Sequence, residues 1–226
     1  MNLDTQYRKA ITVSDQELAT RCARGRVVII DDDAEVLAAL AALIEFSGYA
    51  CETYPSATSY IHVLNYNRPC FHGPCCVLCD VKMPELDGLQ LQKRLAELDD
   101  TPILLMSGAS GAQEAVSAFH GGALDFLIKP IDADILLAAV ANALAASIER
   151  GYLRARKATL AARIASLTER EQDIARRVAA GQTNPMIAET LGIALRTVKW
   201  HRQRALEKIG VDKTTDLVRI ADEVNL

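Results

Sequence analysis

From Arg26 onward, short apolar runs alternate with longer segments of helical periodicity. Apolar runs of this length are typical of buried parallel strands, and the amphipathic segments between them are typical of connecting helices. The pattern predicts strands at 27–30, 50–54, 76–80, 102–107 and 123–128, and helices near 34–47, 56–66, 86–98 and 111–121, with another beginning at Asp132. Repeated strand-helix units indicate a doubly wound α/β domain, in which the carboxyl ends of the strands carry the functional loops.

The pattern changes after residue 131. Residues 132–166 are rich in Ala and carry apolar residues at mixed three- and four-residue spacings, which predicts that the last helix of the α/β domain continues into a long helical linker. The apolar stripe suits a coiled-coil contact between two copies, whereas Gly151 and the basic residues at 154, 156 and 157 interrupt it. Both interpretations of the linker stay open.

Short helices with clear caps are predicted in the remainder of the chain. Thr168 stands three residues before Glu171, which is the spacing of a capping box. Thr183 is placed to cap a second helix that ends in a tight turn at Gly192, and a third helix follows in ALRTVKWHRQRALEKIG. The predicted organisation is an N-terminal extension at 1–25, an α/β domain at 26–147, a helical linker at 148–165 and an all-α domain at 166–226.

Charge separates the two domains. The residues from Arg150 onward include 15 Lys or Arg and 9 Asp or Glu, a net charge of +6, whereas the preceding residues include 10 and 20, a net charge of −10. A basic domain suits a polyanion such as nucleic acid, and an acidic domain suits a cation or a basic partner.

Composition excludes several classes of protein. No run approaches the roughly 18 to 20 apolar residues of a membrane-spanning helix, and residues 1–25 lack the apolar core of a signal peptide. The 6 cysteines are too few and too unevenly spaced for a secreted disulfide-rich domain. We therefore expect a soluble, cytoplasmic protein with no membrane partner.

Acidic residues follow two of the predicted strands. Asp31, Asp32 and Asp33 come directly after the strand at 27–30, and Asp80 ends the strand at 76–80. In a parallel sheet these ends can lie side by side, and carboxylates so close repel one another unless a hard cation such as Mg²⁺ lies between them. Asp33 directly precedes a helix, which fits an N-cap better than a metal ligand.

Two further polar residues fall at the same edge of the sheet. Ser107 ends the fourth strand and Lys129 follows the fifth, which adds a hydroxyl and an ammonium. A carboxylate, a bound cation and an ammonium together suit the capture of a phosphoryl group, with Asp80 as the nucleophile. Each aspartate taken singly fits a solvated loop position, and the alignment of four strand ends is what favours a site.

The segments VVIIDDD, VLCDVKMPELDG, ILLMSG and DFLIKP, in this order, resemble the receiver domains of two-component response regulators, which have a flavodoxin-like (βα)5 fold. The resemblance implies that Asp80 is the phosphoacceptor and that Asp31 and Asp32 form an acidic pair at a metal site. It also implies that Asp32 and Asp80 ligate Mg²⁺ together with the backbone carbonyl of Lys82.

The same resemblance assigns roles to residues around Asp80. Lys129 would contact the phosphoryl group, and Ser107 would be the switch hydroxyl. Phe126 would be the switch aromatic that turns inward with Ser107, although its position equally suits ordinary core packing. The peptide between Lys129 and Pro130 is expected to be cis. Lys82 follows Asp80 by two residues and can influence the attack of water on an acyl phosphate, so the lifetime of the phosphate is left open.

One face of the third C-terminal helix is basic. Helical spacing places Val198, His201, Ala205 and Ile209 on the inward face. The outward face then carries Arg196, Lys199, Trp200, Gln203 and Arg204. A basic helix of this kind fits the major groove of DNA, and the alternative is a merely solvated helix.

The segments LTERE, GQTNPMI and TVKWHRQRALEKIGV resemble the LuxR-type helix-turn-helix of NarL/FixJ-class regulators. The resemblance implies a four-helix DNA-binding domain in which base edges are faced by Lys199, Trp200 and Gln203, and phosphates are contacted by Arg196, Thr197 and Arg204. Ala194 departs from the family, which usually has a capping Ser there, and Trp200 is bulky for a base-reading position. His201 is expected to pack or to bind a phosphate rather than to act in catalysis.

Cysteines crowd around the predicted third strand. Side chains three residues apart in a strand point to opposite faces, so Cys76 and Cys79 cannot close on one zinc ion and are expected in the core. Cys70, His72 and Cys75 lie before the predicted strand in an apparent insertion, where they could converge as a redox or metal site.

Together these features predict a transcription regulator whose DNA binding is controlled by phosphorylation. The receiver would take a phosphoryl group from a sensor histidine kinase onto Asp80, and would catalyse only its own phosphotransfer and dephosphorylation. The expected partners are the kinase, promoter double-stranded DNA, RNA polymerase and, after phosphorylation, a second copy of the chain as a homodimer. The alternative is a thiol- or metal-sensing regulator that uses Cys70 and Cys75.

Overall fold

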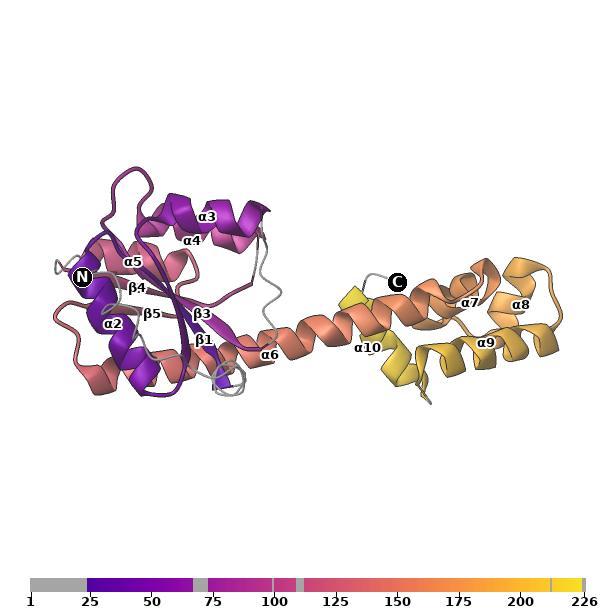
Figure 1. The fold of residues 1–226 in the computed structure, drawn as a ribbon. Coiled ribbons are helices and arrows are strands. Elements are labelled where there is room, and N and C mark those ends of the chain that lie inside the picture. The colour runs from indigo at the N-terminus through magenta and orange to yellow at the C-terminus, as the bar shows by residue number, and fades with distance from the viewer. Residues whose placement is uncertain (1–23, 67–72, 99, 109–111, 212, 225–226) are drawn as a thin grey trace. The chain divides into compact units, whose positions relative to one another are not determined.

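Figure 1 shows the fold of the computed structural model, which describes residues 24–66, 73–98, 100–108, 112–211 and 213–224. The chain divides into two compact units between Gly151 and Tyr152. The long helix α6 (Ala133–Ala165) runs through this division, so its first part belongs to one unit and the rest to the other. Among the described residues, no helix combines the length and the apolar character needed to cross a bilayer.

The first unit is built on a sheet of five parallel strands. The strands are β1 (Arg26–Ile30), β2 (Ala50–Tyr54), β3 (Cys75–Asp80), β4 (Ile103–Ser107) and β5 (Asp125–Ile128). Their order across the sheet is β2-β1-β3-β4-β5. The chain therefore runs from β1 to β2 at one edge and then crosses back to β3 on the other side of β1. This order confirms the predicted doubly wound fold.

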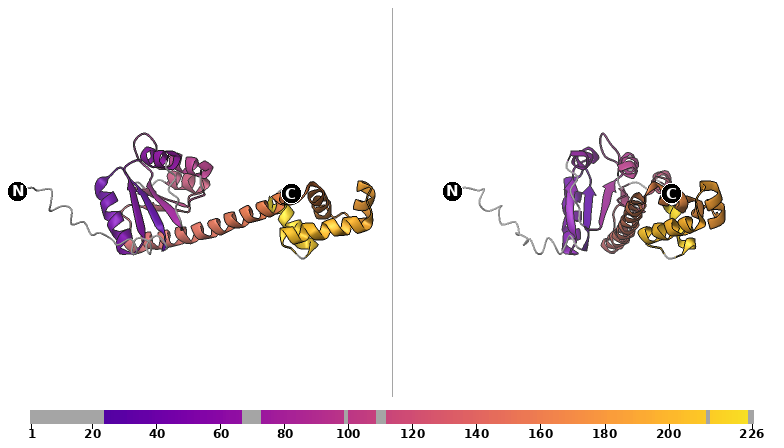
Figure 2. Two further views of the ribbon diagram at one scale, coloured as in Figure 1. Left: turned by 45° about the vertical axis from the view of Figure 1, so that its right-hand side comes forward. Right: turned by 90° about the vertical axis from the view of Figure 1, so that its right-hand side faces the viewer.

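Helices cover both faces of this sheet. α2 (Ala34–Phe46) and the first part of α6 cover one face, and α3 (Ala57–Tyr66), α4 (Gly88–Leu98) and α5 (Ala112–His120) cover the other (Figures 1 and 2). Alternate residues of β1 serve the two layers: Val28 and Ile30 pack under α3 to α5, and Val27 and Ile29 pack under α2 and α6. Because both faces are covered, the central strands are apolar at almost every position.

Local signals in the sequence fix where two helices begin. The carboxylate of Asp33 accepts hydrogen bonds from the backbone N–H of Glu35 at 2.8 Å and of Val36 at 3.3 Å, which confirms the predicted N-cap of α2. At Gly88, the first residue of α4, an added Cβ would lie 2.3 Å from the carbonyl oxygen of Asp80. Only glycine lets α4 begin so close to the end of β3.

The second unit is helical. It contains the end of α6 together with α7 (Glu169–Ala179), α8 (Asn184–Leu191), α9 (Leu195–Ile209) and α10 (Thr214–Val224). α9 packs against α7 and α8, and α10 packs against α7. The core of the unit is one apolar cluster that includes Ile174, Ile187, Val198 and Ile209.

The predicted helix caps of this unit are present. Thr168 and Glu171 form a capping box at the start of α7. Thr183 caps α8, and Gly192 ends it in the left-handed conformation with φ of 62°. Ala194 stands at the N-cap of α9 without a side-chain hydrogen bond.

The structure corrects the sequence interpretation at one cysteine of β3. Cys76 and Cys79 are buried in the clusters on opposite faces of the sheet, as predicted. Cys75 lies within β3 rather than in a segment before it, because Arg26 of β1 pairs with Cys75 and lengthens the strand. Its side chain is buried in the core, and Cys70 and His72 lie outside the described residues.

Candidate functional site

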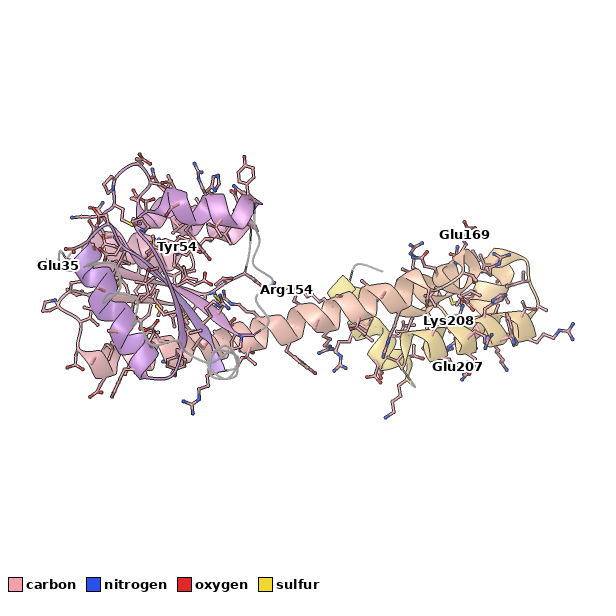
Figure 3. The ribbon with its side chains drawn as sticks, viewed as in Figure 1. Glu35, Tyr54, Arg154, Glu169, Glu207 and Lys208 are labelled. Atoms are coloured by element: carbon pink, nitrogen blue, oxygen red, sulfur yellow. The ribbon has the colours of Figure 1, made fainter. Side chains whose placement is uncertain are left out.

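Strand register brings the predicted acidic residues to one edge of the sheet. Ile30 pairs with Cys79, so Asp31 and Asp80 come next on two adjacent strands. Ser107 pairs with Ile128, which places Ser107 beside the residue that precedes Lys129. Glu35 and Tyr54, labelled in Figure 3, lie in the first turn of α2 and at the end of β2.

Lys129 joins two of these carboxylates. Its Nζ donates to Oδ2 of Asp31 at 2.6 Å and to Oδ1 of Asp80 at 2.5 Å. The remaining oxygens accept backbone N–H groups, Asp31 Oδ1 from Asp33 at 3.0 Å and Asp80 Oδ2 from Lys82 at 2.6 Å. Asp31 is 1% exposed and Asp80 is 6% exposed, so the ammonium compensates negative charge that water barely reaches.

Burial also changes the proton affinity of these groups. Burial raises the pKa of the Asp80 carboxyl above its usual value, and the hydrogen bond and charge of Lys129 oppose this rise only in part. Burial lowers the pKa of Lys129, but the hydrogen bonds with Asp31 and Asp80 outweigh it, and the net pKa is raised. Lys129 therefore stays protonated beside a poorly solvated carboxylate, an arrangement suited to nucleophilic attack on an anionic group.

The predicted metal ligands are brought together only in part. Asp31 and Asp80 share the ammonium of Lys129, whereas Asp32 is exposed. Within the described part of the chain, no three His, Cys, Asp or Glu side chains form a group that could hold a metal ion. The donors at this edge are nevertheless hard oxygens, the kind that Mg²⁺ prefers.

Ser107 lies beside this cluster, and Phe126 lies in β5, three residues before Lys129. Ser107 is fully buried, and its backbone carbonyl accepts the N–H of Lys129 at 2.8 Å. Phe126 is half-buried and packs against the core under α3, α4 and α5. Lys129 and Pro130 are joined by a cis peptide bond, which confirms that expectation.

Glu114, in the first turn of α5, is a site residue that the sequence interpretation did not single out. Its Oε2 accepts a hydrogen bond from the hydroxyl of Ser107 at 3.0 Å, and its Oε1 lies 3.3 Å from Nζ of Lys82. A usable signal was present, because the helix that follows a parallel strand begins at the edge where that strand ends. An acidic residue in that first turn is therefore a neighbour of Ser107.

α9 carries the predicted basic face. Val198, Ala205 and Ile209 are buried in the core of their unit. The residues on the other side are exposed, namely Arg196, Lys199, Trp200, Gln203 and Arg204, with Thr197 half-buried. The ring of His201 is half-buried and lies edge-on to Trp200 with 4.8 Å between centroids, which confirms that it is packed.

Polar contacts on the sides of α9 hold it in its unit. Arg202 donates to Oδ1 of Asn184 in α8 at 2.8 Å and to Oγ1 of Thr214 in α10 at 2.5 Å. Lys208, labelled in Figure 3, donates to Oε2 of Glu171 in α7 at 2.5 Å. The exposed basic side chains therefore stand on a helix that its neighbours fix in place, as recognition of a nucleic acid requires.

Comparison with known proteins gives two family matches in the order of the two units. Residues 27–141 match the response regulator receiver domain, and residues 165–221 match the bacterial regulatory proteins of the luxR family. The response regulator protein TmoT of Ectopseudomonas mendocina is 35% identical over 199 residues, which cover 88% of this chain and 88% of TmoT. The transcriptional regulatory protein FixJ of Bradyrhizobium diazoefficiens is 34% identical over 199 residues, 88% of this chain and 95% of FixJ.

Solved structures agree with these matches. The response regulator StyR is similar with a TM-score of 0.72 and 33% identity, covering 89% of this chain and 100% of that one. Full-length FixJ from B. japonicum is similar with a TM-score of 0.53 and 33% identity, covering 88% of this chain and 97% of that one. The chain therefore belongs to the two-component response regulators of the NarL/FixJ class, transcription regulators that combine a receiver domain with a LuxR-type DNA-binding domain.

Proposed function

We propose that the receiver accepts a phosphoryl group on Asp80 from a sensor histidine kinase, and that this modification controls promoter binding through α9. The observation that carries the proposal is the cluster of Asp31, Asp80 and Lys129. It presents a poorly solvated carboxylate oxygen, held in place by hydrogen bonds, beside an ammonium that can balance incoming negative charge.

The transfer is a displacement at phosphorus. An oxygen of Asp80 attacks the phosphorus of a phosphohistidine, the O–P bond forms as the P–N bond breaks, and the electron pair of the P–N bond remains on the imidazole nitrogen. Lys129 can exchange its bond with Asp80 for one with a phosphoryl oxygen. Ser107 is the proposed switch hydroxyl and Phe126 the proposed switch aromatic. The receiver then catalyses only its own phosphotransfer and dephosphorylation.

Mg²⁺ suits this edge of the sheet. Bound there, it would neutralise charge on the phosphoryl oxygens during transfer. The carboxylates of Asp31, Asp32 and Asp80 and the backbone carbonyl of Lys82 would hold it, because they are hard oxygen donors. Because the bound ion would supply positive charge beside the carboxylates, Lys129 would be available to contact the phosphoryl group.

Phosphorylation would alter dimerisation and thereby promoter binding. The exposed basic face of α9 supports the DNA-binding half of the proposal. Base edges would be faced by Lys199, Trp200 and Gln203, and phosphates would be contacted by Arg196, Thr197 and Arg204. The proposed partners are the kinase, promoter double-stranded DNA, RNA polymerase and a second copy of the chain, all acting in the bacterial cytoplasm.

Labelling of the full chain with radioactive acetyl phosphate and Mg²⁺ tests the assignment of Asp80. We expect Asp80→Asn to abolish labelling, and a chelator of Mg²⁺ to abolish it in the wild-type chain. Asp33→Asn is a matched control, because asparagine also caps helices and Asp33 serves α2 rather than the phosphoryl site. Full labelling of the Asp80→Asn chain would overturn the assignment.

A further inference from the structure

Glu114 contacts two residues near the phosphoacceptor Asp80, namely Ser107 and Lys82. We propose that Glu114 is a positioning residue. In the unphosphorylated chain it binds the Ser107 hydroxyl and the Lys82 ammonium, and both groups move to the phosphoryl group once Asp80 is phosphorylated. Glu114 thereby sets how readily the receiver enters its phosphorylated form. This inference rests on the proposed function of Asp80.

The Ser107 hydroxyl is the stronger of the two contacts. A serine hydroxyl has one proton to donate, and here that proton points to Oε2 of Glu114 at 3.0 Å. The Ser107 side chain is shielded from solvent at 0% exposure, so bulk water does not compete for this proton. A phosphoryl oxygen would need the same proton, and Glu114 and the phosphoryl group are therefore competing acceptors.

The Lys82 ammonium is the second contact. Lys82 also binds Asp80 through its backbone N–H, so its side chain starts from the immediate neighbourhood of the phosphoacceptor. Its Nζ lies 3.3 Å from Oε1 of Glu114, but the Lys82 side chain is 62% exposed, and exposed ion pairs are weak. The Lys82 ammonium can therefore leave Glu114 easily. The hydrogen bond between Ser107 and Glu114 is the contact that opposes entry into the phosphorylated form.

Electrostatics favours the exchange once a phosphoryl group is present. The phosphoryl group carries negative charge, which repels the Glu114 carboxylate and attracts Lys82. Before that, the first turn of α5 favours a carboxylate at position 114, because the amino end of a helix carries partial positive charge. Glu114 is therefore a good hydrogen-bond acceptor before phosphorylation, and the phosphoryl group replaces it as acceptor afterwards.

Binding of beryllofluoride with Mg²⁺ to the full chain, measured by calorimetry, tests this role. We expect Glu114→Ala to bind beryllofluoride about tenfold more tightly than wild type, because the variant has no charged hydrogen bond to break first. Glu114→Gln keeps the size of the side chain and a neutral acceptor, and should give a smaller gain in the same direction. Glu97→Gln, an equal change of charge at an exposed position of α4, should leave the affinity unchanged.

A Ser107→Ala background separates positioning from a general structural effect. There the gain from Glu114→Ala should fall to about twofold or less, since only the weak Lys82 contact remains to be released. Unchanged or weaker binding by Glu114→Ala and Glu114→Gln, or an equal gain with and without Ser107, would overturn the inference. Failure of the proposed function is distinct, because the wild-type chain would then bind no beryllofluoride and take no label from acetyl phosphate.

Discussion

Glu171 is a charged side chain that is almost completely buried, at 3% exposure, in the helical unit. Its Oε2 accepts hydrogen bonds from Nζ of Lys208 at 2.5 Å and from the backbone N–H of Thr168 at 2.9 Å. The bond from Lys208 is the main reason why the pKa of Glu171 is lowered, the bond from Thr168 adds to it, and burial opposes both. The folded unit therefore favours the charged form of this residue.

Removal of this charge should destabilise the helical unit. We expect Glu171→Gln to lower the free energy of unfolding at neutral pH by about 1 to 3 kcal/mol, the range for a hydrogen bond to a charged group. Urea unfolding of the full chain can be followed by the fluorescence of Trp200, since the sequence has 1 Trp. Glu169→Gln changes an exposed charge on the same helix and should cost less than about 0.5 kcal/mol. Equal losses in the two variants would contradict a specific role of Glu171.

The same comparison has a defined pH dependence. The pKa of Glu171 is lower in the folded unit than in the unfolded chain. Its contribution to the free energy of unfolding is therefore complete above the pKa of the unfolded chain, about 4.3. It is lost as the pH falls through the lower, folded value. The stability difference between wild type and Glu171→Gln should stay constant from pH 7 to about 5 and shrink below about 4. A difference that grows on acidification has the wrong sign for this account.

At the scale of the element, α9 begins with less support than α7 or α8. Thr168 and Thr183 cap α7 and α8, whereas Ala194 at the start of α9 offers no side-chain acceptor. Its backbone already has the extended conformation of an N-cap, with φ of −63° and ψ of 143°. A capping side chain should fit there without a change of the backbone.

Ala194→Ser is accordingly expected to raise the free energy of unfolding by about 0.5 to 2 kcal/mol. The measurement is again urea unfolding followed by Trp200 fluorescence. Ala162→Ser is the matched control within α6, where serine should instead cost about 0.5 kcal/mol because it is a weaker helix former than alanine. Stabilisation by both substitutions would point to a general effect of serine and not to the cap.

At the scale of the whole molecule, the negative net charge of the chain opposes binding to DNA. The chain carries a net charge of −4, yet the part after residue 149 carries 15 Lys or Arg against 9 Asp or Glu. Binding to a polyanion must therefore come from a local basic surface, and the exposed face of α9 is the surface proposed for it.

Salt dependence measures that surface directly. With a fluorescent duplex of mixed sequence, we expect Arg204→Ala to reduce the slope of log affinity against log salt by about 1, because the phosphate contact proposed for Arg204 is lost. Arg219→Ala removes the same charge from α10, where the side chain is 67% exposed, and should leave the slope unchanged. If both variants reduced the slope equally, net charge rather than the α9 face would govern binding.

Local pattern determined much of this protein. The apolar runs predicted all five strands of the sheet, with boundaries within two residues, because strands covered on both faces must be apolar throughout. The caps at Asp33, Thr168 and Thr183 were equally readable, since a cap bonds only to residues that follow within one turn. Parallel strands also fixed the edge at which Asp31, Asp80, Ser107 and Lys129 gather.

Tertiary structure alone decided which side chains meet. Lys129 bonds Asp31 across 98 residues and Asp80 across 49, Glu114 joins Lys82 to Ser107, and Lys208 reaches Glu171 across 37. Strand order and register placed Cys75 inside β3 and brought the ammonium of Lys129 between the carboxylates of Asp31 and Asp80. Periodicity reports the environment of each residue averaged over its face of a helix or strand, whereas a contact between two side chains requires the position of both backbones in space.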